Sequence, residues 1–205
     1  MPRRRVIPSD EVLHRATALF WRQGYEATSV EDLVQATGAN RAGLYGAFTG
    51  KRGLFLRALD HYRDGFVGRA LAGVEETGAS IPAIRAYFDA LIDLDVQRGL
   101  PGPGCLMANS MTEVAPQDEE VQARVRAHFD RVRGGFTRAL TNAQSAGELP
   151  AWFETASFGH FLAVAAQGLW VFSRICDDEA ELRGFVASML APLTGSSTEE
   201  ASSHG

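Results

Sequence analysis

Cysteine is scarce in this sequence of 205 residues, and the two that occur, Cys105 and Cys176, lie far apart. They form no CxxC pair and have no histidine at metal-ligand spacing, so the sequence predicts neither a disulfide framework nor a zinc site. No pattern emerges for an HExxH segment, a paired carboxylate, or a nucleophile with its base. We therefore expect no metal, no cofactor and no chemistry on a substrate.

Long apolar segments and strand patterns are also missing. We find no apolar run that approaches the roughly 18–20 residues needed to cross a membrane. The first twelve residues include basic side chains but no long apolar stretch before a cleavage site, so they do not resemble a signal peptide. The chain has no convincing strand and no internal repeat. We predict a cytoplasmic, all-α protein of about nine helices with no membrane partner.

The formal net charge of −5 is unevenly distributed. Residues 1–60 hold nine Lys and Arg against six acidic residues, which gives +3, whereas the remainder holds 11 basic and 19 acidic residues, which gives −8. A basic end on an acidic body is typical of a nucleic-acid-binding part joined to a separate regulatory part.

Local signals are strongest between residues 28 and 55. Thr28 and Glu31 have the T-x-x-E spacing of a capping box at a helix start. Gly38 suits the positive φ at a helix end, and Asn40 suits the N-cap of a second short helix. Helices this short are marginal alone, but a helix-turn-helix presents its second helix to the DNA major groove.

From residue 20 to residue 51 the chain contains F-x-x-x-G-Y-x-x-T-S-V-E-D-L-V-x-x-T-G-A-N-R-A-G-L-Y-x-x-F-x-x-K. This pattern resembles the N-terminal DNA-binding domain of the TetR (tetracycline-repressor-like) family, with capping, turn, aromatic and lysine positions in register. The rest of the chain matches the family only in length and helical pattern. The resemblance implies a homodimeric repressor that binds near-palindromic, double-stranded operator DNA and releases it when a small-molecule effector binds.

Within this pattern we predict DNA contacts at Thr28, Asn40, Arg41, Ala42, Gly43, Tyr45 and Lys51. The Arg41 guanidinium could fork onto O6 and N7 of guanine, or it could contact phosphate only. Ala42 and Gly43 let the backbone approach DNA closely. The family often has a hydroxyl residue at Gly43, so one base contact is missing here.

Phosphate contacts are expected at both ends of this motif. Leu44 and Phe48 occupy the buried side of the second helix, which leaves Tyr45 to bind phosphate. Lys51 stands at a helix start, where backbone amides favour an anion. Thr28, at the other cap, is the third predicted phosphate contact.

We divide the chain into a helix-turn-helix domain (1–55), a helical effector-binding and dimerisation domain (56–193), and a Ser-rich tail (194–205) predicted to be disordered. The basic arm at residues 2–5 is either a disordered, solvated end or a contact to phosphate or to the minor groove beside the second helix of the motif. A long helix that begins at Lys51 spans the first junction, so a ligand that tilts its far end would move the DNA-binding part.

Effector-binding side chains are expected among the apolar helices of the second domain. Candidates are Phe88, Leu91, Cys105, Met107, Asn109, Met111, Phe129, Phe136, Gln167 and Trp170. A ligand pocket and an ordinary core use the same residue types, so both interpretations stay open. The segment that begins at Cys105 resembles one found in a TetR branch that includes electrophile-responsive repressors, which makes a reactive thiol the alternative to a small buried side chain at this position.

Dimerisation is assigned to the last two helices, since the segment 150–174 is apolar on nearly all sides. The predicted contacts are Phe158, Leu162, Ala166, Leu169, Phe185 and Met189. Two rival functions remain: a helical ligand-binding or enzymatic bundle that contains a helix-turn-helix, and a DNA-binding protein without an effector.

Overall fold

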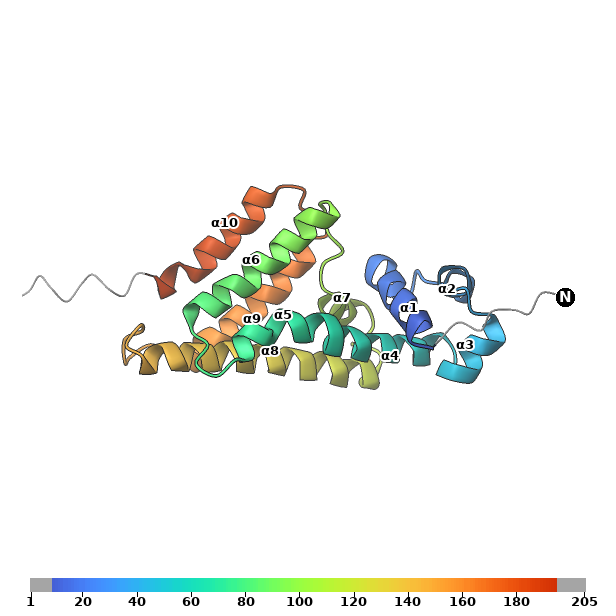
Figure 1. Ribbon diagram of the computed structural model, residues 1–205, viewed down its shortest axis with the longest axis horizontal. Coiled ribbons are helices and arrows are strands. Elements are labelled where there is room, and N and C mark those ends of the chain that lie inside the picture. The colour runs from blue at the N-terminus through green and yellow to red at the C-terminus, as the bar shows by residue number, and fades with distance from the viewer. Residues whose placement is uncertain (1–8, 195–205) are drawn as a thin grey trace, which may run out of the picture. The chain divides into compact units, whose positions relative to one another are not determined.

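The computed structural model describes residues 9–194, and within that range it contains helices joined by turns and loops and no strand, which confirms the predicted all-α class. Figure 1 shows the helices in chain order. The elements are α1 (Ser9–Gln23), α2 (Val30–Thr37), α3 (Arg41–Phe48), α4 (Lys51–Tyr62), a π-helical turn (Arg63–Val67), α5 (Gly68–Glu75), α6 (Ile81–Arg98), α7 (Leu106–Glu113), α8 (Glu119–Ser145), α9 (Thr155–Phe172), α10 (Glu179–Leu190) and a 3₁₀ turn (Ala191–Leu193). Residues 2–5 and most of the predicted tail lie outside the described range.

The long helix expected from Lys51 is present. The helical backbone continues from α4 through the π-helical turn into α5 without a break. Counted as one helix, this segment brings the described residues to nine helices and a short 3₁₀ turn, in agreement with the prediction.

The chain forms two compact units that are not continuous in sequence. Among the described residues, the first unit contains 9–68 together with Cys105–His128, and the second contains Arg69–Gly104 together with 129–194. The first unit therefore combines α1 to α4 with α7 and the start of α8. The boundaries predicted from periodicity at 55 and 193 stay predictions.

The core of the first unit is built on an aromatic cluster. Phe20 of α1 and Phe55 of α4 are almost fully buried, with ring centroids 5.0 Å apart. The Tyr25 ring lies 4.6 Å from Phe55. Leu33 of α2 and Leu44 of α3 are also buried, so each short helix anchors one leucine in the shared core. This burial stabilises helices that would be marginal in isolation.

The core of the second unit is formed by α6, α8, α9 and α10. Phe88 stacks with Phe136 at 5.7 Å and with Trp170 at 6.3 Å between ring centroids. A Cβ at Gly159 of α9 would lie 2.3 Å from Thr137 Oγ1 of α8, so a residue without a side chain permits this close approach.

One helix corrects the expectation about apolar runs. The 18 residues of α9 are long and apolar enough to cross a membrane by length and composition alone. The helix combines small and apolar residues without a charge, which a search for unbroken hydrophobic runs overlooked. Six of its residues are buried within this helical chain, including Leu162, Ala166 and Leu169.

Candidate nucleic-acid interface

The helix-turn-helix opens with a capping box one residue later than predicted. Ser29, not Thr28, is the N-cap of α2: its Oγ accepts the Asp32 N–H at 3.1 Å, and the Ser29 N–H donates to Asp32 Oδ2 at 2.8 Å. The side-chain and backbone hydrogen bonds from Ser29 lower the pKa of the Asp32 carboxyl. The predicted box between Thr28 and Glu31 was therefore wrong, because S-x-x-D has the same spacing and occupies the helix start.

Thr28 has a different role from the predicted one. Its side chain is fully buried, and its hydroxyl donates to the Gly24 carbonyl at 2.6 Å. A hydroxyl in that position cannot reach a phosphate, so the predicted side-chain contact at Thr28 is not available.

The turn between the two helices forms as expected. Gly38 has φ +73° at the end of α2, and its N–H bonds to the Val34 carbonyl. Asn40 is the N-cap of α3, where its Oδ1 accepts the Gly43 N–H at 2.6 Å. A Cβ at Gly43 would lie 3.1 Å from that oxygen, so the glycine also makes room for the cap.

The outward face of α3 has almost no bulk at its centre. Only Leu44 is buried, and Phe48 is partly exposed. At about 100° per residue, Ala42 and Gly46 lie opposite those two side chains. Nothing lies within 4 Å of a Cβ built on Gly46, so this part of the helix surface is open.

Arg41 and Tyr45 share one flank of this outward face, because they are four residues apart. Arg41 forms an exposed ion pair with Glu31 of α2. Such pairs contribute little free energy, so a phosphate or base edge can displace Glu31. Tyr45 is 50% exposed, and its ring would lie 3.2 Å from a Cβ at Gly50.

Lys51 lies at the start of α4, beside this flank. Gly50 is its N-cap and provides no side-chain hydrogen bond, so the first amides of α4 keep no side-chain acceptor. The Lys51 ammonium lies 4.2 Å from the centroid of the Tyr25 ring and donates to the Glu26 carbonyl at 3.5 Å. Burial raises the pKa of Tyr25, which keeps its phenol neutral under the lysine. A helix N-terminus with a fixed lysine is suited to a phosphate.

Arg52, the next residue, fixes the start of α4 to the start of α8. Its guanidinium forms two hydrogen bonds to Asp118 at 2.7 and 3.0 Å and an ion pair with Glu120 at 2.7 Å. These bonds raise the pKa of Arg52 and lower that of Asp118. Arg52 is thus held by two carboxylates, whereas Lys51 contacts a carbonyl oxygen and an aromatic ring.

Sequence reasoning missed two residues that shape this site. Ser29 was overlooked in favour of its neighbour. Gly53 was not considered, yet a Cβ there would lie 1.8 Å from the Phe48 carbonyl oxygen. The tight turn between α3 and α4 thus depends on Gly53, and the only signal in the sequence was a glycine in the first turn of a helix, where it is a weak helix former.

The predicted effector residues fall in both units. In the second unit, Phe88, Phe136 and Trp170 are buried and stacked together, while Leu91, Phe129 and Gln167 are partly exposed. In the first unit, Cys105, Met107 and Asn109 are buried and Met111 is partly exposed. Cys105 is the N-cap of α7. Their assignment to an effector stays a prediction.

The predicted dimer contacts divide into two groups. Leu162, Ala166, Leu169 and Met189 are buried within the chain's own core and offer no surface to a second copy. Phe158 is partly exposed and Phe185 is 44% exposed. Apolar periodicity identified α9 and α10 but could not say which of their apolar residues point outward.

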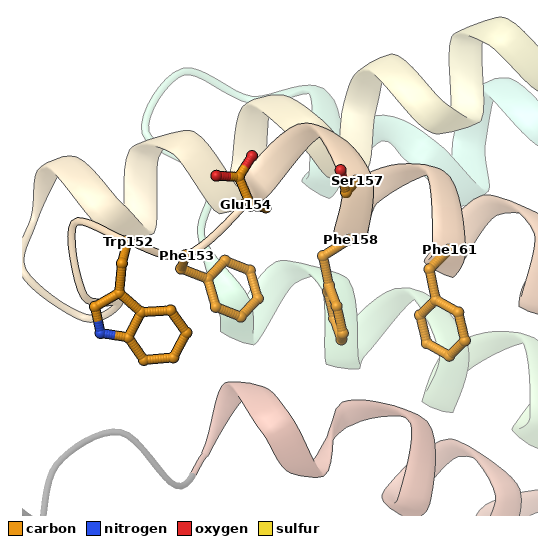
Figure 2. Close-up of a pocket in the computed structure, with 6 residues that line it drawn as sticks. All are labelled: Trp152, Phe153, Glu154, Ser157, Phe158 and Phe161. Carbon is orange, nitrogen blue, oxygen red and sulfur yellow. The ribbon is translucent and has the colours of Figure 1, made fainter.

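The outward apolar residues of α9 and its flanks form a different set, which we call the apolar stripe: Phe161, Val164, Val171, Phe172 and Ile175. An aromatic row adjoins it. Trp152, Phe153, Phe158 and Phe161 project to the same side, while Glu154 and Ser157 point away from the rings (Figure 2). Trp152 is 77% exposed. A surface this apolar is typical of a protein-protein contact.

The chain is similar to known regulators over nearly its whole length. The family described as bacterial regulatory proteins of the tetR family matches residues 12–58, and the tetracyclin repressor-like C-terminal domain matches residues 80–189. The HTH-type transcriptional repressor ComR of Escherichia coli strain K12 is 33% identical over 84% of this chain and 82% of its own length. The HTH-type transcriptional repressor DhaR of Mycobacterium sp. strain GP1 is 23% identical over 89% of this chain and 90% of its own.

Solved structures agree with the sequence comparison. A cysteine-substituted variant of the TetR family regulator CifR, complexed with 26-bp double-stranded operator DNA, superposes with a TM-score of 0.75 at 26% identity. The match covers 92% of this chain and 98% of that one. These matches, together with the outward face of α3, show that the chain belongs to the TetR family of transcriptional regulators.

Proposed function

We propose that this protein is a homodimeric, cytoplasmic transcriptional repressor that binds a near-palindromic operator through α3 and releases it when a small-molecule effector binds. One observation carries the DNA-binding part: a helix with an open, small-residue outward face stands next to the bare N-terminus of α4 with Lys51. ComR and DhaR are named repressors, and a cysteine-substituted variant of CifR is complexed with operator DNA, which supports the same activity here.

We expect the DNA contacts to divide between bases and phosphates. Ala42, Gly43 and Gly46 let the α3 backbone enter the major groove closely, and Arg41 leaves Glu31 to bind a guanine edge or a phosphate. Tyr45 and Lys51 bind phosphate and set the register of the helix on the duplex. Asn40 caps α3 and orients its first turn.

Two copies are needed to bind two half-sites. A two-fold dimer that covers the apolar stripe holds the two α3 helices about 34–36 Å apart, which matches successive major grooves. An effector acts by favouring a state with a different separation, and it shifts the equilibrium only by its differential affinity for the two states. An apolar compound or an electrophile that modifies Cys105 fits the residues predicted for the effector.

The test is a binding titration of the pure protein with its own upstream DNA and with a scrambled duplex at several salt concentrations. We expect specific binding that weakens with salt. Arg41→Ala should reduce the preference for operator over scrambled DNA, while Lys51→Ala should weaken both about equally and reduce the salt slope by about one. Equal affinity for both duplexes in the unmodified protein would refute the proposal.

A further inference from the structure

A hydrogen-bonded carboxylate joins α7 to the turn that precedes α2, within the first unit. Glu113, the last residue of α7, accepts the Tyr25 N–H at 3.1 Å through Oε2 and the Glu26 N–H at 2.9 Å through Oε1. A Cβ at Gly24 would lie 2.8 Å from Glu113 Oε1. Gly24, with φ +85°, therefore both permits the turn and makes room for the carboxylate.

This turn determines where the helix-turn-helix begins. The Gly24 N–H bonds to the Phe20 carbonyl at 2.8 Å and ends α1. The Thr28 hydroxyl closes the turn on the Gly24 carbonyl, and Ser29 then caps α2. A displacement of Tyr25 and Glu26 would therefore also displace the start of α2.

The same turn also touches the proposed phosphate contact. The Lys51 ammonium lies over the Tyr25 ring and donates to the Glu26 carbonyl. Lys51 and Glu113 therefore hold one two-residue segment from two helices, α4 and α7. If Lys51 turns to a phosphate, as proposed above, the Tyr25 and Glu26 amides stay bonded to Glu113.

Glu113 stands where a carboxylate is not expected on local grounds. It lies at the C-terminal end of α7, where the helix dipole disfavours negative charge. The two amide donors compensate, since hydrogen bonds to a charged acceptor are the strong ones. Most of α7 is buried, from Leu106 to Ser110, and the helix also packs on α4. The carboxylate is therefore held on a well-packed helix, not on a free surface arm.

We propose that Glu113 is a positioning residue that couples α7 to the DNA-binding head, so that a displacement of α7 reorients the turn at Tyr25–Glu26 and with it α2 and α3. This inference rests on the proposed function. Coupling is reciprocal, so operator binding must also change the stability of α7. That reciprocity allows a test without a known effector.

The experiment measures amide hydrogen exchange with and without operator DNA in four proteins: the unmodified chain, Glu113→Ala, Glu113→Gln and Glu119→Gln. Glu119 is an exposed carboxylate at the start of α8, so its substitution removes the same charge without touching the turn. Thermal melts establish that each variant is folded. Glutamine keeps one acceptor oxygen, which provides a milder change if alanine prevents folding.

In the unmodified protein and in Glu119→Gln, operator should slow exchange across residues 106–113. In Glu113→Ala this response should disappear, and the Tyr25 and Glu26 amides should exchange about five- to tenfold faster because they have lost their acceptor. Glu113→Gln should fall between. Charge alone predicts tighter DNA binding when a carboxylate is removed, so a weaker operator affinity in Glu113→Ala than in Glu119→Gln identifies positioning.

Failure of this inference differs from failure of the proposed function. If the unmodified protein shows no preference for operator, the proposed function is refuted. If operator binds specifically and α7 responds equally in Glu113→Ala and in the unmodified protein, or does not respond in either, the coupling through Glu113 is refuted and the repressor assignment stands.

Discussion

Two helices, α3 and α9, expose surfaces that the fold itself does not require. The eight residues of α3 bury one leucine, and the middle of its outward face holds alanine and glycine. The eighteen residues of α9 bury one side in the core and turn Phe161, Val164 and Val171 outward. The outward face of α3 thus has small side chains at its centre, whereas the outward face of α9 has large apolar ones.

The difference matches two kinds of partner. A helix that enters a DNA groove needs its backbone near the base edges, so small residues at the centre and polar residues on the flank are favourable. A helix that meets a second copy of the chain needs large apolar side chains, because burial of apolar area stabilises the dimer. In both helices we therefore expect the outward residues, not the buried ones, to contact the partner.

The largest effect on this comparison is expected from a substitution that displaces α3 relative to α4. Gly53→Ala places a Cβ within 1.8 Å of the Phe48 carbonyl oxygen, so the turn between α3 and α4 must move. We expect a loss of about 3 kcal/mol in the free energy of unfolding, or roughly 6–12 °C in Tm. Operator binding should be lost with it. Calorimetry and a DNA titration measure both effects. Gly73→Ala, at an open position in α5, is the control and should not lower Tm.

A charge on the apolar stripe should separate the two copies. Val164 is 51% exposed, so Val164→Glu should leave the fold of one chain intact. In a two-fold dimer the change places an unpaired carboxylate on both sides of the interface. We expect the dimer dissociation constant to rise at least about 100-fold, which corresponds to roughly 2.7 kcal/mol. Sedimentation analysis measures this change, and operator affinity should fall in parallel.

Ala86→Glu is the matched control for the stripe, since Ala86 is an exposed residue in the second turn of α6. It introduces the same charge and should leave the dimer unchanged. A Val164→Glu protein that sediments as a stable dimer would show that the stripe is not the interface.

The opposite experiment adds bulk to the bare helix. Gly46→Ala in α3 meets no neighbour within 4 Å, and alanine is a better helix former by about 1 kcal/mol. Tm should rise by about 2–4 °C. Operator affinity should nonetheless fall about tenfold, because the new methyl stands between the α3 backbone and the bases. Gly73→Ala should give the same gain in Tm with unchanged affinity. Tighter operator binding by Gly46→Ala would mean that this face does not enter the groove.

Much of the fold could be predicted because periodicity and capping are local properties. Gly38 and Asn40 took the predicted conformations, and the apolar spacing located the helices within a few residues. The outward residues of α9 could not be predicted in the same way. Leu162 and Val164 are equally apolar, and only the packing of α9 decides that the first is buried and the second exposed.

Contacts between segments far apart in the chain could not be predicted from the sequence either. Glu113 and Tyr25 are 88 residues apart, and no local pattern pairs them. The glycine at position 53 does not by itself indicate that the Phe48 carbonyl oxygen leaves no room for a Cβ there. A local pattern also gave one wrong prediction at short range. Two overlapping capping-box patterns, one from Thr28 and one from Ser29, fit the same helix start, and the sequence could not say which residue is the N-cap. The structure decides for Ser29, because the Thr28 side chain is buried in the preceding turn.

The assignment of Ser29 as the N-cap gives the prediction with the smallest expected effect. Ser29→Ala removes the N-cap of α2 and should lower Tm by about 2–4 °C. Glu31→Ala, which would break the alternative box, should leave Tm within about 1 °C, since an exposed ion pair contributes little. The Ser29 hydrogen bonds lower the pKa of Asp32 in the folded state, so their stabilisation is present above the ordinary value of 3.8 and is lost as the pH falls through the folded pKa. The Tm difference between Ser29→Ala and the unmodified protein should therefore shrink in acid. If Glu31→Ala instead lowers Tm more than Ser29→Ala does, Thr28 and not Ser29 is the N-cap of α2.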